Sequence, residues 1–246
     1  GRRLMAHPIR SALLTSETPS RSLTVENNLQ ELLGSKTRQR IFESYEEAAR
    51  EEPKRCYLGG SAIGHECSRY LWYQFRDCCE SSFDGRMLRL FRRGHREEPE
   101  VVADLKRIGC KVFDVDPNTG KQFEVAFLGG HFRGHADGVV LGLPEAPNTW
   151  HMLEIKTSST KEFAKLQKDG VEKAKPVHFA QMQIYMHGLQ LTRACYIAVC
   201  KENDDLWIER IKYNKPIAEQ ILAKAERIVK ANAAPAKLSE RPDYFA

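Results

Sequence analysis

The sequence has no long apolar run and only a small excess of one charge. Its longest apolar stretches, such as residues 194–200 (ACYIAVC), are strand-sized. They fall far short of the roughly 20 residues that cross a bilayer. No stretch at the start resembles a secretion signal. The 38 basic and 33 acidic residues are largely interspersed and leave a net charge of +5, which permits a nucleic-acid partner without requiring one. We expect a cytoplasmic protein with no membrane partner.

Paired cysteine motifs are also absent. The seven cysteines, at positions 56, 67, 78, 79, 110, 195 and 200, are odd in number and contain no CxxC spacing. Such usage is typical of reduced thiols, and it argues against both disulfides and a structural zinc site.

The 246 residues, 41% of them hydrophobic, suffice for one large core. We expect a flexible arm or expression remnant at 1–22, followed by a single domain at 23–246. That domain divides into a helical part at 23–109, a core at 110–213 and a C-terminal helix at 214–232.

Apolar residues at helical spacing predict helices in the first half of the chain. The expected helices are 25–52, divided in two near Gly34 and Ser35; 61–77, with Ser61 as N-cap; and 86–109, kinked or split at Gly94 and Pro99.

Strand-like segments then follow at 111–116, 121–127, 131–143 and 149–157. Turn-forming residues separate them, which predicts consecutive hairpins in a meander. Helices are expected again at 160–170, 177–191 and 216–232, with strands at 193–201 and 205–213. This order is typical of an α+β fold (α/β), a mixed sheet flanked by helices.

Two charged residues interrupt the apolar strand at 149–157. Glu154 and Lys156 are two apart, so they share one face while Ile155 points to the other. One interpretation is a surface ion pair, worth about 0–1 kcal/mol. The other is a strand that carries chemistry.

Asp137 favours the second interpretation. It lies between Gly134 and Val139, on the strand that a meander would place beside Glu154. Two neighbouring carboxylates repel unless a cation lies between them, and oxygen ligands suit Mg²⁺ or Mn²⁺. With Lys156 to hold or deprotonate a water, the set has what phosphodiester hydrolysis requires.

The spacing Asp137-(16 residues)-Glu154-Ile155-Lys156 resembles the PD-(D/E)XK nuclease superfamily, with Ala136 at the variable proline position. The flanking motifs are similar to the RecB-like and lambda-exonuclease-like branch: Gln181 and Tyr185 as QxxxY, and Gly94 and Glu98 as the upstream glycine and acid. The resemblance implies a restriction-endonuclease-like core with an N-terminal helical elaboration.

The resemblance also implies roles for these residues. Asp137, Glu154 and the carbonyl of Ile155 would bind the metal, and Glu98 would complete or water-bridge the site. Lys156 would orient or activate the attacking water, Gln181 would fix Lys156 or a phosphate, and Tyr185 would pack or hydrogen-bond at the DNA backbone. Two alternatives stay open: Glu97 competes with Glu98, and Tyr185 also fits an ordinary core helix.

Further contacts with DNA are expected at His135, His178, Ser61 and Arg69. Ser61 and Arg69 are candidates for a phosphate pocket by analogy with lambda exonuclease. His131, Arg133 and His135 alternate toward Asp137 and would share its face, although the exposed face of an edge strand explains them equally well.

Residues 66–75 (ECSRYLWYQF) resemble the segment that supplies the first cysteine of a [4Fe–4S] cluster in some related nucleases. No cysteine follows Cys200, so the residues shown cannot complete such a cluster. One would exist only if a C-terminal cysteine cluster is missing from this chain. Cys67 is otherwise a buried thiol.

The function that this resemblance implies is a metal-dependent DNA exonuclease of phage or bacterial recombination or repair, acting on duplex ends or single strands in a bacterium or phage-infected host. A homo-oligomer and a recombination partner protein are expected with it. The alternatives are a structure-selective endonuclease of the same fold and a catalytically inactive DNA-binding subunit.

Overall fold

The computed structural model describes residues 22–53, 55–76 and 83–240. The described residues divide into two compact units: one within Gly1–Glu52 and Phe83–Leu88, the other within Pro53–Ser82 and Arg89–Ala246. The arm expected at 1–22, apart from its last residue, and the cysteines at 78 and 79 lie outside the described residues.

The first unit is dominated by α1 (Ser22–Glu51), one helix of 30 residues. The predicted division near Gly34 was therefore wrong. A glycine inside a helix costs only about 1 kcal/mol relative to alanine, which does not end a long helix. A Cβ at Gly34 would meet nothing within 4 Å, so no packing constraint bends the chain there. Within the same unit, Glu46 Oε1 accepts a 2.7 Å hydrogen bond from the amide of Gly85.

Helix α3 (Gly85–Arg107) continues past Gly94 and Pro99, so the predicted split was wrong, while the kink stays a prediction. A proline removes one backbone hydrogen bond. On its C-terminal side, Val101, Val102 and Leu105 are buried, and their packing stabilises the helix beyond the proline.

Helix α2 (Ser68–Phe75) begins later than predicted. Its N-cap is Cys67, whose Sγ accepts a hydrogen bond from the amide of Tyr70 at 3.4 Å. Ser61 lies instead in the short 3-10 helix η2 (Gly60–Ala62). Between the two segments the chain passes close to a neighbouring helix at Gly64, where a Cβ would lie 2.5 Å from the Cα of Val177.

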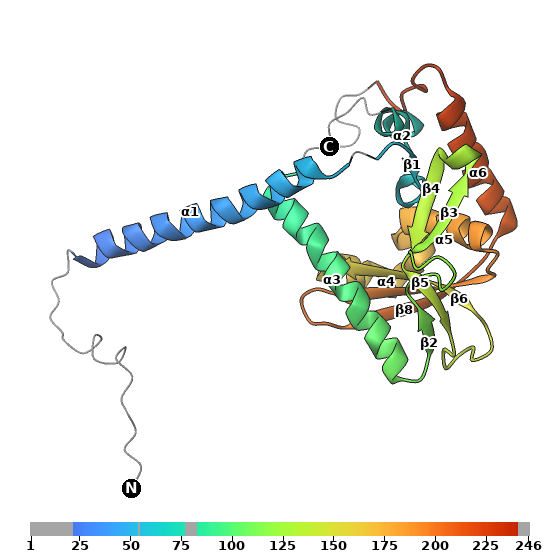
Figure 1. Cartoon of the computed structure of the whole chain (residues 1–246), viewed down its shortest axis with the longest axis horizontal. Coiled ribbons are helices and arrows are strands. Elements are labelled where there is room, and N and C mark those ends of the chain that lie inside the picture. Colours follow the sequence, from blue (N-terminus) through green and yellow to red (C-terminus); the bar gives the residue numbers. More distant parts are fainter. Residues whose placement is uncertain (1–21, 54, 77–82, 241–246) are drawn as a thin grey trace, which may run out of the picture. The chain divides into compact units, whose positions relative to one another are not determined.

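The second unit contains two sheets (Figure 1). The five-stranded sheet has the order β2-β5-β6-β7-β8, and the three-stranded sheet has the order β1-β4-β3. Strands β6 and β7 are parallel and joined through α4 and α5, whereas β2, β5 and β6 pair antiparallel, as do β7 and β8. The strands are β1 (Leu58–Gly59), β2 (Lys111–Phe113), β3 (Phe123–Phe127), β4 (Phe132–Ala136), β5 (Gly138–Leu141), β6 (His151–Ser158), β7 (Arg193–Cys200) and β8 (Leu206–Lys212). The expected mixed α+β architecture is confirmed.

The predicted meander was wrong in its first part. The segment 131–143 forms two strands in different sheets: β4 pairs with β3, and β5 pairs with β2. The division falls at Asp137, so this residue does not continue the alternation of Arg133 and His135. At Gly138 a Cβ would lie 2.5 Å from the carbonyl oxygen of Phe113. The pairing expected between the Asp137 region and the Glu154 strand is confirmed, because Gly138 opposes Leu153.

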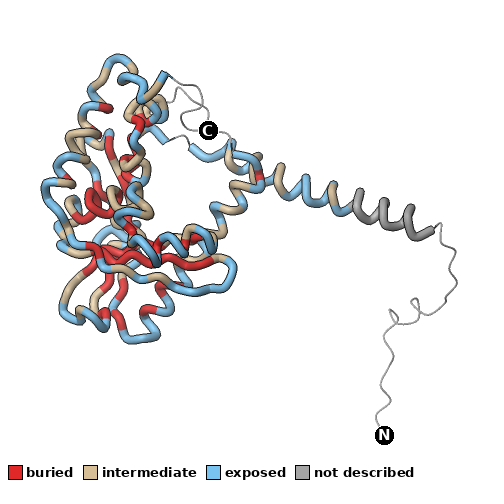
Figure 2. Tube along the Cα trace, turned by 180° about the vertical axis from the view of Figure 1, so that it is seen from behind, coloured by how far each residue is buried: buried red, intermediate tan, exposed pale blue. Residues whose placement is uncertain are grey.

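The five-stranded sheet is covered on both faces. Ile155 and Ile197 pack in one cluster with Val101 and Leu105 of α3. Met152 belongs to the other cluster, which includes residues of α4 (Thr160–Ala174), α5 (Pro176–Leu189) and α6 (Lys215–Lys230). Figure 2 shows the buried residues concentrated along the strands. Among the described residues no helix has the length and apolarity to cross a membrane.

Side chains of α2 bind the chain that follows α6. Arg69 Nη1 donates to the carbonyl of Pro235 at 2.8 Å, Trp72 Nε1 to that of Ala231 at 2.9 Å, and Arg76 Nη2 also to that of Ala231 at 2.8 Å. Segments about 160 residues apart in the sequence are joined in this way.

Candidate active site

Asp137 occupies the gap between β4 and β5. The pairing of β5 with β6 ends where Gly138 opposes Leu153, and no residue of β5 pairs with Ile155. Asp137 Oδ2 accepts a 2.7 Å hydrogen bond from the amide of Ile155. Its carboxylate is therefore fixed at the side of β6, next to Glu154.

Glu154 is fully buried, with 0% of its surface exposed. Its Oε1 forms an ion pair with Lys156 Nζ. Beyond this ion pair, neither Glu154 Oε2 nor Gln181 Oε1 has a hydrogen-bond partner among the described residues. An unsatisfied buried polar group costs about 1–3 kcal/mol, so these atoms are free to bind something the chain itself does not supply.

Burial and mutual repulsion perturb the charges here. Burial raises the pKa of Glu154 to about 7, and Asp137 adds to this, while Lys156 and Gln181 act in the opposite direction. Burial also raises the pKa of Asp137, against the charge of Lys156 and the amide of Ile155. Burial alone would lower the pKa of Lys156, but the charges of Glu154 and Asp137 raise it to about 12. Together, the two carboxylates and Lys156 form a site where binding of an additional cation is favoured.

Helix α3 brings a third carboxylate to this group. The pKa of Glu98 is raised by burial and by the charge of Asp137, and lowered by His95 and Lys156. A Cβ at Gly94 would lie 3.9 Å from Thr157 Oγ1, so the backbone of α3 passes close to the end of β6. Gly94 and Glu98 thus flank the charged residues of β6.

The two neighbouring acids of α3 have different partners. Glu98 Oε1 is 3.1 Å from His95 Nδ1, whereas Glu97 Oε1 is 3.9 Å from Arg93 Nε. Arg93 also donates to the carbonyl of Lys201 at 2.7 Å. The charge of Asp137 acts on Glu98, and the choice of Glu98 over Glu97 stays a prediction. His95 was missed from the sequence, where its spacing of three from Glu98 on a helix was the available signal.

Gln181 and Tyr185 both lie buried on α5, with 4% and 2% of their surfaces exposed. Gln181 is close enough to Glu154 to lower the pKa of that carboxyl. Tyr185 fills a space against two glycines: a Cβ would lie 2.2 Å from its Cε1 at Gly134 and 2.5 Å at Gly60. This matches the core alternative for Tyr185, and its contact with DNA stays a prediction.

His178 faces the same group from one turn before Gln181. Its Nδ1 lies 2.9 Å from the hydroxyl of Tyr196. Burial and the charges of Lys156 and Lys175 lower the pKa of His178 to about 3, so its ring is neutral near pH 7. Tyr196 opposes Glu154 across the parallel strands β6 and β7. No local pattern in the sequence indicates Tyr196, because its relation to Glu154 depends on strand register.

The other residues expected to contact DNA have different surroundings. His135 Nε2 is 3.2 Å from Glu124 Oε2, and Ser61 is exposed in η2. Arg69 donates to the carbonyl of Pro235 and to the hydroxyl of Tyr73. Their contacts with DNA stay predictions.

Within residues 22–53, 55–76 and 83–240, no group of three or more His, Cys, Asp or Glu side chains is arranged to hold a metal ion. The described cysteines are all free, and Cys67 is buried as expected. The donor chemistry at Glu154 nevertheless fits a hard divalent cation, because its buried Oε2 lacks a hydrogen-bond partner and the carboxylate of Asp137 lies beside it.

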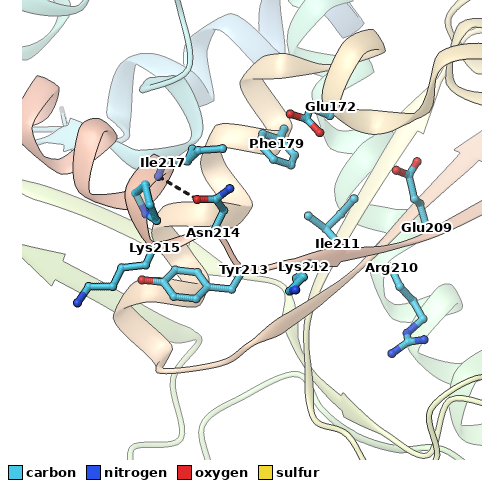
Figure 3. A pocket seen from close by; sticks show the side chains of 11 residues that line it. Glu172, Phe179, Glu209, Arg210, Ile211, Lys212, Tyr213, Asn214, Lys215 and Ile217 are labelled. Atoms are coloured by element: carbon cyan, nitrogen blue, oxygen red, sulfur yellow. Dashed lines mark hydrogen bonds between the residues drawn. The ribbon is translucent and has the colours of Figure 1, made fainter.

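A hollow of about 550 Å³ lies elsewhere, at the junction of β8 and α6 (Figure 3). Its lining includes Glu172, Phe179 and Tyr213, and it shares no residue with the charged group around Glu154. Asn214 caps α6 there, with its Oδ1 accepting from the amide of Ile217 at 3.3 Å.

Comparisons with known proteins define the fold. No protein-family model matches the sequence, and no curated protein sequence matches it. The structure is similar to an alkaline exonuclease (LHK-Exo) from Laribacter hongkongensis, with 16% identity, a TM-score of 0.50 and coverage of 76% of this chain and 90% of the other. LHK-Exo in complex with dAMP gives 16% identity, a TM-score of 0.51 and coverage of 77% and 90%. The chain therefore has the fold of this exonuclease.

Proposed function

We propose that this chain is a Mg²⁺- or Mn²⁺-dependent deoxyribonuclease of the PD-(D/E)XK type that degrades DNA from its ends. The observation that carries the proposal is Glu154, a fully buried carboxylate whose Oε1 is paired with Lys156 and whose Oε2 has no hydrogen-bond partner, next to Asp137. The shared fold with an alkaline exonuclease that binds dAMP, a deoxynucleotide, supports DNA as the substrate. We assign the activity to bacterial or phage recombination or repair.

Asp137, Glu154 and the carbonyl of Ile155 would hold the divalent ion, with Glu98 beside them. A bound divalent ion neutralises the scissile phosphate and lowers the pKa of a water molecule. The amide of Ile155 keeps Asp137 in place through its 2.7 Å hydrogen bond, so one ligand is oriented before any ion binds.

Lys156 acts as a cation in this proposal. Neighbouring carboxylates raise its pKa to about 12 in the metal-free protein, so it holds its proton there and can orient a water or stabilise charge on the phosphate. This favours orientation of the nucleophile over its deprotonation by Lys156. Gln181, buried next to Glu154, helps to keep the pair in place.

End-labelled linear DNA and closed circular DNA, each incubated with Mg²⁺ or Mn²⁺, test the proposal. We expect loss of linear DNA only, abolished by Lys156→Ala and retained in Lys215→Ala, which removes an exposed lysine of α6. Nicking of circles would support a structure-selective endonuclease instead. Salt-sensitive DNA binding without metal-dependent cleavage would indicate a binding subunit.

A further inference from the structure

His95 follows Gly94 on α3, and its side chain is 77% exposed. Its Nδ1 lies 3.1 Å from Glu98 Oε1. An exposed pair at this spacing stabilises a helix by only about 0.2–0.5 kcal/mol. The contact therefore contributes little to folding. It matters because of the position of Glu98.

Glu98 differs from the surface acids of the same helix. Its side chain is 28% exposed, and the charges of Asp137 and Lys156 both act on it. Glu97, the adjacent acid, pairs with Arg93 instead. His95 thus contacts the one of these two acids that is coupled to the candidate active site.

The ionised state of Glu98 determines which side chain of the pair donates the hydrogen bond. An ionised carboxylate only accepts hydrogen bonds, so Nδ1–H of His95 is the donor and Glu98 Oε1 the acceptor. A glutamate side chain has several rotatable bonds, and a fixed donor limits the orientations of its carboxylate. Hydrogen-bond partners behind the direct ligands orient those ligands and thereby contribute to metal affinity.

We propose that His95 is a positioning residue: its Nδ1–H holds the carboxylate of Glu98 beside Asp137 and so raises the affinity of the site for a divalent cation. This inference rests on the proposed function. It concerns the orientation of Glu98 and does not require His95 itself to touch the ion.

The test is the affinity of the metal-free protein for Mn²⁺, measured by titration calorimetry and by electron paramagnetic resonance of free Mn²⁺. His95→Ala should weaken binding about 2-fold, in keeping with the strength of an exposed pair at this spacing. His95→Asn, which keeps an N–H donor near the position of Nδ1, should restore most of this loss. In a Glu98→Gln background, His95→Ala should cause no further weakening. Glu97→Gln is the matched control and should bind Mn²⁺ like the wild type.

Three results would overturn the inference: unchanged affinity in His95→Ala, equal weakness of His95→Asn and His95→Ala, or an undiminished effect of His95→Ala in Glu98→Gln. These results leave the proposed function standing if the wild type binds Mn²⁺ and cleaves DNA. A wild type that does neither removes the proposed function, and this inference with it.

Discussion

The amide of Ile155 donates a 2.7 Å hydrogen bond to Oδ2 of Asp137, at the point where the pairing of β5 with β6 has ended. A side chain thus takes the place of a neighbouring strand for this one amide. The contact both satisfies the backbone of β6 and fixes a carboxylate next to Glu154. The effects of substitutions at Asp137 on folding and on catalysis are therefore separable.

Asp137→Asn should keep the fold and lose cleavage. The asparagine oxygen can still accept from Ile155, whereas Asp137→Ala leaves a buried amide unpaired at a cost of about 1–3 kcal/mol. Urea unfolding and cleavage of linear DNA measure the two effects. An asparagine variant as unstable as the alanine variant would contradict the role of this hydrogen bond.

Glu154→Gln should change how stability depends on pH. Burial raises the folded-state pKa of Glu154 from 4.5 to about 7, so the folded protein holds this proton more tightly than the unfolded chain does. The stabilisation of the folded state by protonated Glu154 is fully present below pH 4.5 and is lost as the pH rises through 7. The free energy of unfolding of the wild type, relative to the variant, should fall by on the order of 3 kcal/mol between pH 4 and pH 8. Urea titrations in chelator at both pH values test this, and parallel pH profiles would exclude it.

His178 should affect the pH dependence of stability in the opposite direction, so that its contribution is lost at low pH. Burial lowers its pKa from 6.5 to about 3, so its neutral form is favoured in the folded state. The contribution of neutral His178 to the free energy of unfolding is present above pH 6.5 and is lost as the pH falls toward 3. We expect thermal unfolding of the wild type to shift downward between pH 7 and pH 4 more than that of His178→Asn. A larger shift in the variant would show that His178 is not the group responsible.

Gly134→Ala should destabilise the protein, because its Cβ would lie 2.2 Å from Tyr185 Cε1. Overpacking of this kind typically costs about 1–3 kcal/mol. Adding Tyr185→Leu should recover part of the loss, since the two residues compete for one space. Gly34→Ala is the control: with nothing within 4 Å of its Cβ, it should stabilise α1 by about 0.5–1 kcal/mol. Additive effects in the double variant would argue against the steric explanation.

The sequence predicted those elements that short-range periodicity defines. The strand with Glu154 and the apolar strand at 194–200 were found, because each has a continuous pattern of its own. The alternation in the segment 131–143 predicts one strand, because it gives no sign that Phe132 and Val139 pair with different sheets. Partner choice in a sheet depends on contacts far apart in the sequence, which no local pattern contains.

The same distinction holds for the candidate site. The spacing of Asp137, Glu154 and Lys156 predicted their proximity, since hairpin neighbours lie side by side. His95 and Tyr196 were not predicted. His95 is an exposed helical residue whose partner becomes evident only once Glu98 is seen beside Asp137, and Tyr196 depends on the register between β6 and β7.

The hydrogen bonds from Arg69 and Trp72 to the chain after α6 have a consequence for how the protein is made. Proteins emerge from the ribosome at about 5–20 residues per second, and their domains fold as units during synthesis. Helix α2 emerges early, but the carbonyl groups that these side chains bind belong to Ala231 and Pro235. The second unit cannot acquire its final contacts before those residues have left the ribosome. Until then the indole N–H of Trp72 and the guanidinium of Arg69 lack these carbonyl partners.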